Sequence, residues 1–269
     1  MQLTLPSTFF DVVEFKFVVK NIQDFFKKLK TMNGNTNHLE VEATSPYMKK
    51  NGATMVDSGE YSNSKSYKPN ELAARCDKLV EENILPVLED FVRIPNLSRN
   101  FDKEFLTNGL LQKACKHVLT WAEKQDIKGL TLEMYEAEGR TPLVYGEVPA
   151  TEGVTNSILM YGHIDKQPHL DADWDAGLSA IEPVRKGDYV YGRGISDDGY
   201  APFASLSIVK LLQEQEQPHP KFIFFFECDE ESGSYDIEYW INNFKAQMGS
   251  PELFVCLGKF FPISPFKKN

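Results

Sequence analysis

Three short segments of the 269-residue sequence combine histidine or carboxylate side chains with glycines. A neutral histidine offers a ring nitrogen to zinc, and carboxylates offer oxygen atoms to several divalent metals. Each segment by itself has an ordinary structural interpretation, but the three together favour a metal site with hydrolytic chemistry. The segments are Gly162–Asp165, Tyr191–Tyr200 and Glu227–Ser234.

The first segment places His163 and Asp165 directly after a short apolar run, residues 158–161. His163 is a candidate metal ligand. Asp165 can accept the other ring N–H, which would fix the tautomer and raise the basicity of the ligand nitrogen. The alternative interpretation is a His–Asp pair that only closes a turn.

The second segment contains adjacent carboxylates, Asp197 and Asp198, between Gly194 and Gly199. Glycines allow the backbone to turn tightly here. A carboxylate at this position can bridge two cations through its two oxygens. The alternative is that Asp197 or Asp198 caps the helix predicted to begin near Ala201, because capping is a common use of aspartate.

The third segment follows the apolar run 222–226 and has four acids within five residues. Their mutual repulsion is costly, and a bound dication would offset it. Of the adjacent Glu230 and Glu231, one can act as a metal ligand and the other as a general base that takes a proton from the attacking water. The alternative is an acidic, solvated loop.

Strand and helix patterns alternate around these segments and predict an α/β fold, a mostly parallel sheet with helices on both faces. Ligand sites in such sheets form beyond the carboxyl ends of the strands, where the segments lie. Pro86 should kink or restart the first predicted helix. We expect helices at 70–91, 106–122, 201–216 and 235–247, a hairpin or two adjacent strands over 129–148, and strands at 158–161, 222–226 and 253–257.

Composition narrows the class of protein. A net charge of −10 argues against nucleic acid or an anionic membrane as the main partner. The four cysteines are widely spaced, which favours reduced thiols. No apolar run has a transmembrane length and no secretory signal is evident, so a cytoplasmic location is expected. Residues 1–69 predict an extension with a helix over 9–29 and a loop or disorder over 32–68.

Longer motifs resemble a known family. YGHIDKQP, YGRGISDDGYAPFAS and CDEESGS, in this order, resemble the co-catalytic zinc metallopeptidases that include carnosinase, cytosolic non-specific dipeptidase, aminoacylase-1 and carboxypeptidase G. The stretches LVEENILPVLEDFVRIPNLS and EGRTPLVYGEV are also similar to members of this family. The resemblance covers residues 70–257 and implies part of a zinc-exopeptidase catalytic domain, without its lid domain.

The resemblance also implies roles for individual residues. His163 resembles the ligand of one zinc ion, Glu231 resembles the ligand of the other, and Asp197 resembles the carboxylate that bridges both. Asp165 resembles the acid that orients His163. Glu230 resembles the general base.

The implied reaction is metal-dependent hydrolysis of peptide or amide bonds in dipeptides or N-acyl amino acids. Two zinc ions are the implied cofactors, with manganese or cobalt as alternatives. Full-length family members often dimerise through a domain that we expect to be absent here.

The pattern departs from the family at Gly258, where the resemblance places a further zinc-binding aspartate. We therefore expect a truncated chain: an extension at 1–69, a partial metallopeptidase domain at 70–257, and a non-family tail at 258–269. Each zinc ion would keep about two protein ligands, whereas catalytic zinc normally has three. Weak or no metal binding and no appreciable peptidase activity are expected, with a non-catalytic interaction protein on a dead peptidase domain as the alternative.

A calcium loop is a further alternative. Asp171, Asp173, Asp175 and Glu182 match the spacing of ligand positions in an EF-hand. Ala176 stands where that loop requires glycine, and the flanking residues do not predict helices. These departures make an EF-hand a poor interpretation.

Overall fold

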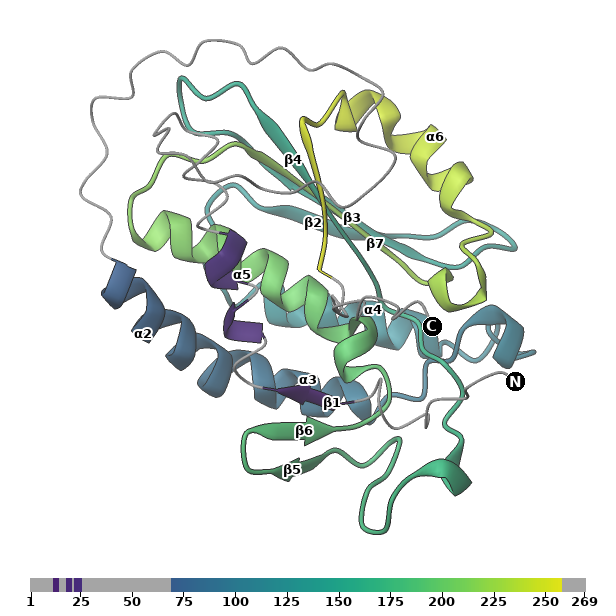
Figure 1. The fold of residues 1–269 in the computed structure, drawn as a ribbon. Coiled ribbons are helices and arrows are strands. Elements are labelled where there is room, and N and C mark those ends of the chain that lie inside the picture. The colour runs from purple at the N-terminus through teal and green to yellow at the C-terminus, as the bar shows by residue number, and fades with distance from the viewer. Residues whose placement is uncertain (1–11, 15–17, 21, 26–68, 258–269) are drawn as a thin grey trace, which may run out of the picture.

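The structure is a computed structural model that describes residues 12–14, 18–20, 22–25 and 69–257. The predicted tail that begins at Gly258, and most of the predicted extension, lie outside these residues. The described residues form a five-stranded sheet in the order β2-β3-β7-β4-β8 (Figure 1). Its strands are β2 Thr131–Tyr135, β3 Leu143–Val148, β4 Ser157–His163, β7 Lys221–Glu227 and β8 Leu253–Cys256.

The sheet is mixed, but only β3 runs against the other four strands described. Strand β4 pairs in parallel with both β7 and β8. Strand β3 pairs antiparallel with β7 and with β2, so β2 points the same way as β7. The expected hairpin over 129–148 is therefore confirmed, and most strands share one direction, as the alternating pattern predicted.

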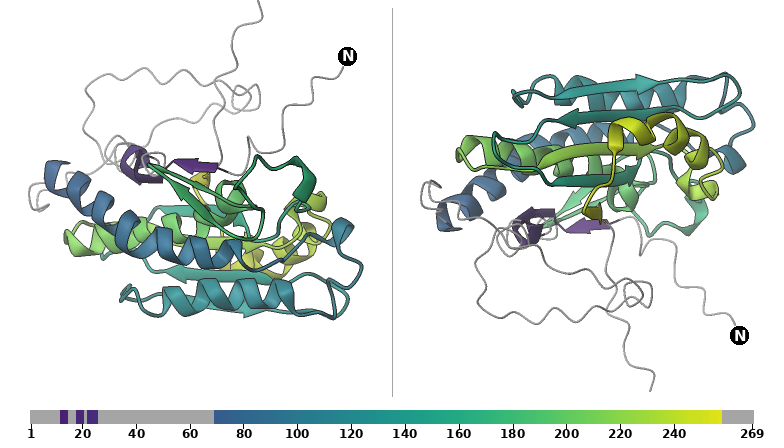
Figure 2. Two further views of the ribbon diagram at one scale, coloured as in Figure 1. Left: turned by 90° about the horizontal axis from the view of Figure 1, so that it is seen from below. Right: turned by 90° about the horizontal axis from the view of Figure 1, so that it is seen from above.

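Helices cover both faces of this sheet because β7 is apolar on both sides. Phe222, Phe224 and Phe226 belong to the larger core cluster, whereas Ile223 and Phe225 belong to a second cluster with α6. In Figure 1, α6 lies above the sheet and α2 to α5 lie below it, and the view from below in Figure 2 shows α2 crossing in front of α5. The helices are α2 Pro69–Leu79, α3 Leu85–Val92, α4 Leu110–Ala122, α5 Tyr200–Glu214 and α6 Ile237–Met248.

The first predicted helix is restarted at Pro86, as expected. A π-helical segment, Val80–Ile84, separates α2 from α3, and Pro86 lies in the first turn of α3. Proline has no N–H to donate, and the chain passes it through this π-helical turn, in which the N–H of Leu85 donates to the Val80 carbonyl. The second predicted helix is shorter than its apolar pattern, because Gly109 adopts a left-handed conformation immediately before α4 begins.

Parts of the predicted extension pack onto the rest of the molecule. Strand β1, Val12–Glu14, pairs antiparallel with β6, Tyr189–Tyr191, which also pairs with β5, Val184–Lys186. Residues 18–20 and 22–25 are helical, and the ring of Phe25 lies 6.1 Å from that of Phe222. The helix predicted over 9–29 thus begins only after a strand, and its apolar residues join the core.

Two further features are the state of the cysteines and the character of the helices. The four cysteines, all of which lie in the described part of the chain, are free, as expected for reduced thiols. None of the helices in the described ranges combines the length and the apolar character that a membrane span requires.

Candidate metal centre

The parallel pairing of β4 and β7 brings two of the predicted segments to one edge of the sheet. His163, the last residue of β4, lies opposite Glu227, the last residue of β7. The chain after each strand stays in register, because the N–H of Ile164 donates to the carbonyl of Glu227 at 2.8 Å. The first and third segments therefore meet beyond the carboxyl ends of adjacent strands, where such sheets place ligand sites.

The second segment forms the tight turn that its glycines predicted. Gly194 has a φ of +76°, and the N–H of Gly199 donates to the Gly194 carbonyl at 2.9 Å. Gly199 is required by space, because a Cβ there would lie 2.4 Å from the Gly194 carbonyl oxygen and 2.5 Å from the ring of Phe91. The N-cap residue of α5 is Gly199, which has no side chain, so neither Asp197 nor Asp198 occupies the N-cap position.

The three predicted ligands converge. Donor atoms of His163, Asp197 and Glu231 all lie within 4.8 Å of one another. Nε2 of His163 lies 3.3 Å from an oxygen of Asp197 and 3.7 Å from an oxygen of Glu230. His163 is buried, whereas the side chains of Asp197 and Glu230 are 52% and 43% exposed. The histidine therefore lies at the buried side of the site, and the carboxylates of Asp197 and Glu230 lie at its solvent-exposed side.

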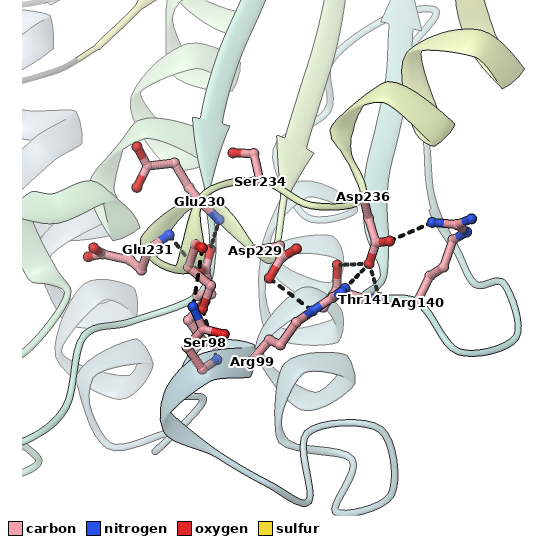
Figure 3. Close-up of polar contacts among 12 residues, drawn as sticks. Ser98, Arg99, Arg140, Thr141, Asp229, Glu230, Glu231, Ser234 and Asp236 are labelled. Carbon is pink, nitrogen blue, oxygen red and sulfur yellow. Dashed lines mark hydrogen bonds and ion pairs between the residues drawn. The ribbon is translucent and has the colours of Figure 1, made fainter.

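Asp165 joins the first segment to the third. Its two carboxylate oxygens accept the backbone N–H groups of Glu230 at 3.2 Å and Glu231 at 3.0 Å. Nδ1 of His163 lies 3.2 Å from the carbonyl of Asp165 and 3.5 Å from its carboxylate. Asp165 thus contacts the histidine, as predicted, and also holds the backbone that carries the two glutamates. Figure 3 shows Glu230 and Glu231 side by side on this turn.

The electrostatics of the site come from crowded, buried acids. Burial raises the pKa of Glu231 to about 7, with His163 opposing this shift and Asp197 adding to it. Burial likewise raises the pKa of Asp198 well above its usual range. For His163, burial lowers the pKa, but hydrogen bonds to Asp165 and Asp197 outweigh it, and the net pKa is well above the ordinary value. The arrangement favours a positive charge among these carboxylates.

The third segment is not the solvated loop of the alternative interpretation. Glu227 and Asp229 are buried, and burial raises their pKa values to about 7 and about 6. Glu227 accepts hydrogen bonds from the hydroxyls of Tyr161 and Ser234. These two acids face inward, and they support the turn that presents Glu230 and Glu231.

Sequence reasoning missed several residues that hold this site. Gln167 donates its amide N–H to the carboxylate of Glu231. Lys166 is buried and donates from Nζ to the carbonyls of Phe91 and Ile94, each at 2.7 Å. In the sequence, Lys166 and Gln167 are recognisable only as two polar residues that follow the His163–Asp165 pair. Their position does not indicate which groups they contact.

The calcium-loop alternative has no support in the fold. Asp171–Asp173 form a short 3-10 turn, and the strand β5 follows Glu182 where an EF-hand has a helix. Among the described residues, the group of metal-ligand side chains that converges is His163, Asp197 and Glu231.

Known proteins resemble this chain over the same region. Residues 159–257 match peptidase family M20/M25/M40. An uncharacterized metallohydrolase of Methanocaldococcus jannaschii is 28% identical over 190 residues, which cover 68% of this chain and 45% of that protein. One of Methanococcus maripaludis is 27% identical over 113 residues, which cover 40% of this chain and 26% of that protein.

Two solved structures share the fold. A family M20 metallo-carboxypeptidase of Sulfolobus solfataricus aligns with a TM-score of 0.56 and 21% identity, over 66% of this chain and 38% of its own. Human carnosine dipeptidase 1 aligns with a TM-score of 0.54 and 20% identity, over 68% of this chain and 40% of its own. The chain spans less than half the length of each of these relatives. The region that matches peptidase family M20/M25/M40, residues 159–257, includes all three converging donors.

Proposed function

We propose that this chain carries the metal site of a hydrolase that cleaves peptide or amide bonds in dipeptides or N-acyl amino acids. The observation that carries the proposal is the convergence of His163, Asp197 and Glu231, whose donor atoms lie within 4.8 Å of one another. The match of residues 159–257 to peptidase family M20/M25/M40 supports a metal-dependent hydrolase. The substrate class is supported by similarity to a metallo-carboxypeptidase and to a carnosine dipeptidase.

The donor set fits a divalent cation. One imidazole nitrogen and two carboxylate oxygens form a set of the kind that catalytic zinc uses, and manganese and cobalt accept the same donors. A cation would also relieve the repulsion that contributes to the raised pKa of Glu231. We assign His163, Asp197 and Glu231 as ligands. If two ions bind, as the resemblance to co-catalytic enzymes implies, His163 and Asp197 would hold one and Asp197 and Glu231 the other, so each ion would keep only two of these three donors.

The remaining residues have distinct tasks. When bound, the metal supplies a Lewis acid that polarises the substrate carbonyl and favours deprotonation of water. Glu230 is half-exposed at the open side and 3.7 Å from His163, so it can accept a proton from water and later return it to the leaving amine. Asp165 fixes the orientation of His163 and the position of the Glu230 and Glu231 backbone.

Metal binding is the first test. Zn²⁺, Co²⁺ and Mn²⁺ are titrated into metal-free chain, and binding is followed by calorimetry and by metal content after dialysis. His163→Asn should abolish uptake. His169→Asn, a half-buried histidine outside the cluster, should leave it unchanged. Equal uptake by wild type and H163N would refute the assigned site.

Hydrolysis is the second test. The loaded chain is incubated with dipeptides and with N-acetyl amino acids, and release of free amino acid is measured. Glu230→Gln should lower any such rate by about 10²–10⁴-fold while metal uptake is retained, because general acid–base catalysis contributes an effect of this size. Metal uptake without hydrolysis of any substrate would favour the non-catalytic interaction protein instead.

A further inference from the structure

A turn far away in the sequence braces the loop that carries Glu230 and Glu231. This turn, Ser98–Asn100, contacts residues 229–236 (Figure 3). The hydroxyls of Ser98 and Ser232 are 2.6 Å apart, and the N–H of Asn100 donates to the Ser232 hydroxyl at 2.9 Å. The N–H of Ser98 donates to the Lys166 carbonyl at 2.9 Å, so the same turn also touches the chain after Asp165.

Arg99 lies at the centre of this contact, between two buried carboxylates. Its Nε is 3.3 Å from Asp229, and its Nη2 donates to Asp236. The Asp229 and Asp236 side chains are 0% and 4% exposed, and that of Arg99 is 22% exposed. Figure 3 shows the Arg99 side chain reaching from the turn toward both acids. One guanidinium therefore joins the two ends of the loop.

Aromatic rings hold the guanidinium in place. Its central carbon lies 5.1 Å from the ring centre of Phe105 and 5.4 Å from that of Tyr235. A planar guanidinium can stack on rings while it donates in two directions, whereas an ammonium group offers only a point charge. The site is therefore shaped for arginine.

The two acids determine the shape of the loop. The carbonyl of Asp229 accepts the N–H groups of Ser232 at 3.2 Å and Ser234 at 2.8 Å, which forms the turn containing Glu230 and Glu231. At the other end, Asp236 also accepts hydrogen bonds from Nη1 of Arg140 at 2.6 Å and from the N–H of Thr141 at 3.0 Å. Loss of the Arg99 guanidinium would remove the positive charge that lies 3.3 Å from the Asp229 carboxylate, and Asp229 is the residue next to Glu230.

We propose that Arg99 is a positioning residue for the metal centre, which fixes the 229–236 loop through Asp229 and Asp236 and so presents Glu230 and Glu231 to the site. Its effect on metal affinity rests on the proposed function. Its effect on the order of the loop does not.

The experiment compares the unsubstituted 269-residue chain with Arg99→Met, Arg99→Lys and the control Arg185→Met. Arg185 forms an exposed ion pair with Glu81 and is not part of the 229–236 loop. Amide hydrogen exchange is measured without metal at residues 230–234 and, as an internal reference, at the β7 residues 222–226. Zn²⁺ and Co²⁺ affinities are then measured by competition with a chelating dye.

The expected result is local. In R99M the 230–234 amides should exchange about tenfold faster or more while the β7 amides keep their rates, because only the loop opens. Metal affinity should fall by about 10–100-fold, the usual effect of removing a group that supports metal ligands. R99K should lie between R99M and wild type, and R185M should match wild type.

Three results separate the possible failures. Wild-type exchange rates and metal affinity in R99M would overturn the inference. Equally faster exchange in β7 would also overturn it, because Arg99 would then stabilise the whole fold rather than the loop. If R99M does not fold, the same criteria apply to R99K. Absence of metal binding by the wild-type chain would refute the proposed function alone, and the exchange data would still decide the role of Arg99.

Discussion

The carboxylate of Asp165 accepts the backbone N–H of Glu231 at 3.0 Å, so the loop after β4 holds the loop after β7. Both residues lie at the same edge of the sheet, where the two strands end in register. The proposed metal ligand Glu231, on one loop, is thereby positioned by Asp165 on the other. The site is assembled from several loops that depend on one another, and single substitutions should reveal that dependence.

Asp165→Asn should weaken metal binding by about 10–100-fold, as expected for a group that orients ligands. An asparagine amide can accept one of the two N–H groups, but its NH₂ would face the other donor. Affinity is measured by competition with a chelating dye. Asp173→Asn, in an exposed turn, is the matched control and should bind as wild type. An unchanged affinity for D165N would show that the loops hold their positions without this acid.

Lys166→Met should lower the free energy of unfolding by about 3 kcal/mol, because buried carbonyls would lose their donor. The Lys166 ammonium group donates to the carbonyls of Phe91 and Ile94 at 2.7 Å and lies 4.2 Å from the centre of the Phe91 ring. Urea denaturation measures the change. Lys113→Met, on the exposed side of α4, should stay within about 0.5 kcal/mol of wild type. A similar small change in K166M would contradict the prediction.

Asp236→Asn should remove a stabilisation that depends on pH. Burial raises the pKa of Asp236, but the N–H of Thr141 and the guanidiniums of Arg140 and Arg99 outweigh it, and the net pKa is lowered. An acid with a lowered folded pKa stabilises the fold above its unfolded pKa of about 3.9 and loses this contribution as the pH falls through the folded pKa. D236N should therefore be less stable than wild type at pH 7, and the difference should shrink below about pH 4.

Urea unfolding of both proteins between pH 2.5 and pH 7 measures this difference. Asp175→Asn, an exposed acid, is the control and should differ little from wild type at any pH in this range. A difference between D236N and wild type that stays constant down to the lowest pH would contradict the assignment of the lowered pKa to Asp236.

Gly162→Ala should destabilise the fold by about 1–3 kcal/mol, because an added Cβ overpacks a filled site. That Cβ would lie 2.8 Å from an oxygen of Asp198 and 2.9 Å from Cβ of Ala201. Since Asp198 adjoins Asp197, metal affinity should fall as well. Thermal unfolding and metal titration measure the two effects. Full stability and full affinity in G162A would mean that α5 can move away from β4 at little cost.

Local patterns predicted most of the elements. Residues 222–226 are apolar without interruption, which is typical of a strand that is buried on both faces, and they form the middle of β7. The spacing of apolar residues over 201–216 predicted α5 to within two residues at each end. Pro86 marked the restart of the first helix. In each case the physical cause acts over a few neighbouring residues, so the sequence displays it directly.

Long-range contacts were not predictable in this way. Arg99 and Asp236 are 137 positions apart, and Lys166 and Phe91 are 75 apart. Nothing near Arg99 distinguishes it from a solvated surface arginine. The packing of Phe25 against Phe222 is a contact of the same kind, because the composition of residues 9–29 predicted a helix but not its partner.

The sequence by itself determined the donor types, the strands that precede His163 and Glu227, and the glycines that turn the chain at Asp197. Only the tertiary structure decided that these donors meet, because β4 and β7 had to pair in parallel and in a register that aligns their ends. Strand pairing is set by packing on both faces of the sheet and by the loops around it, which no short stretch of sequence encodes. The same packing decided which acids became buried supports and which face the site.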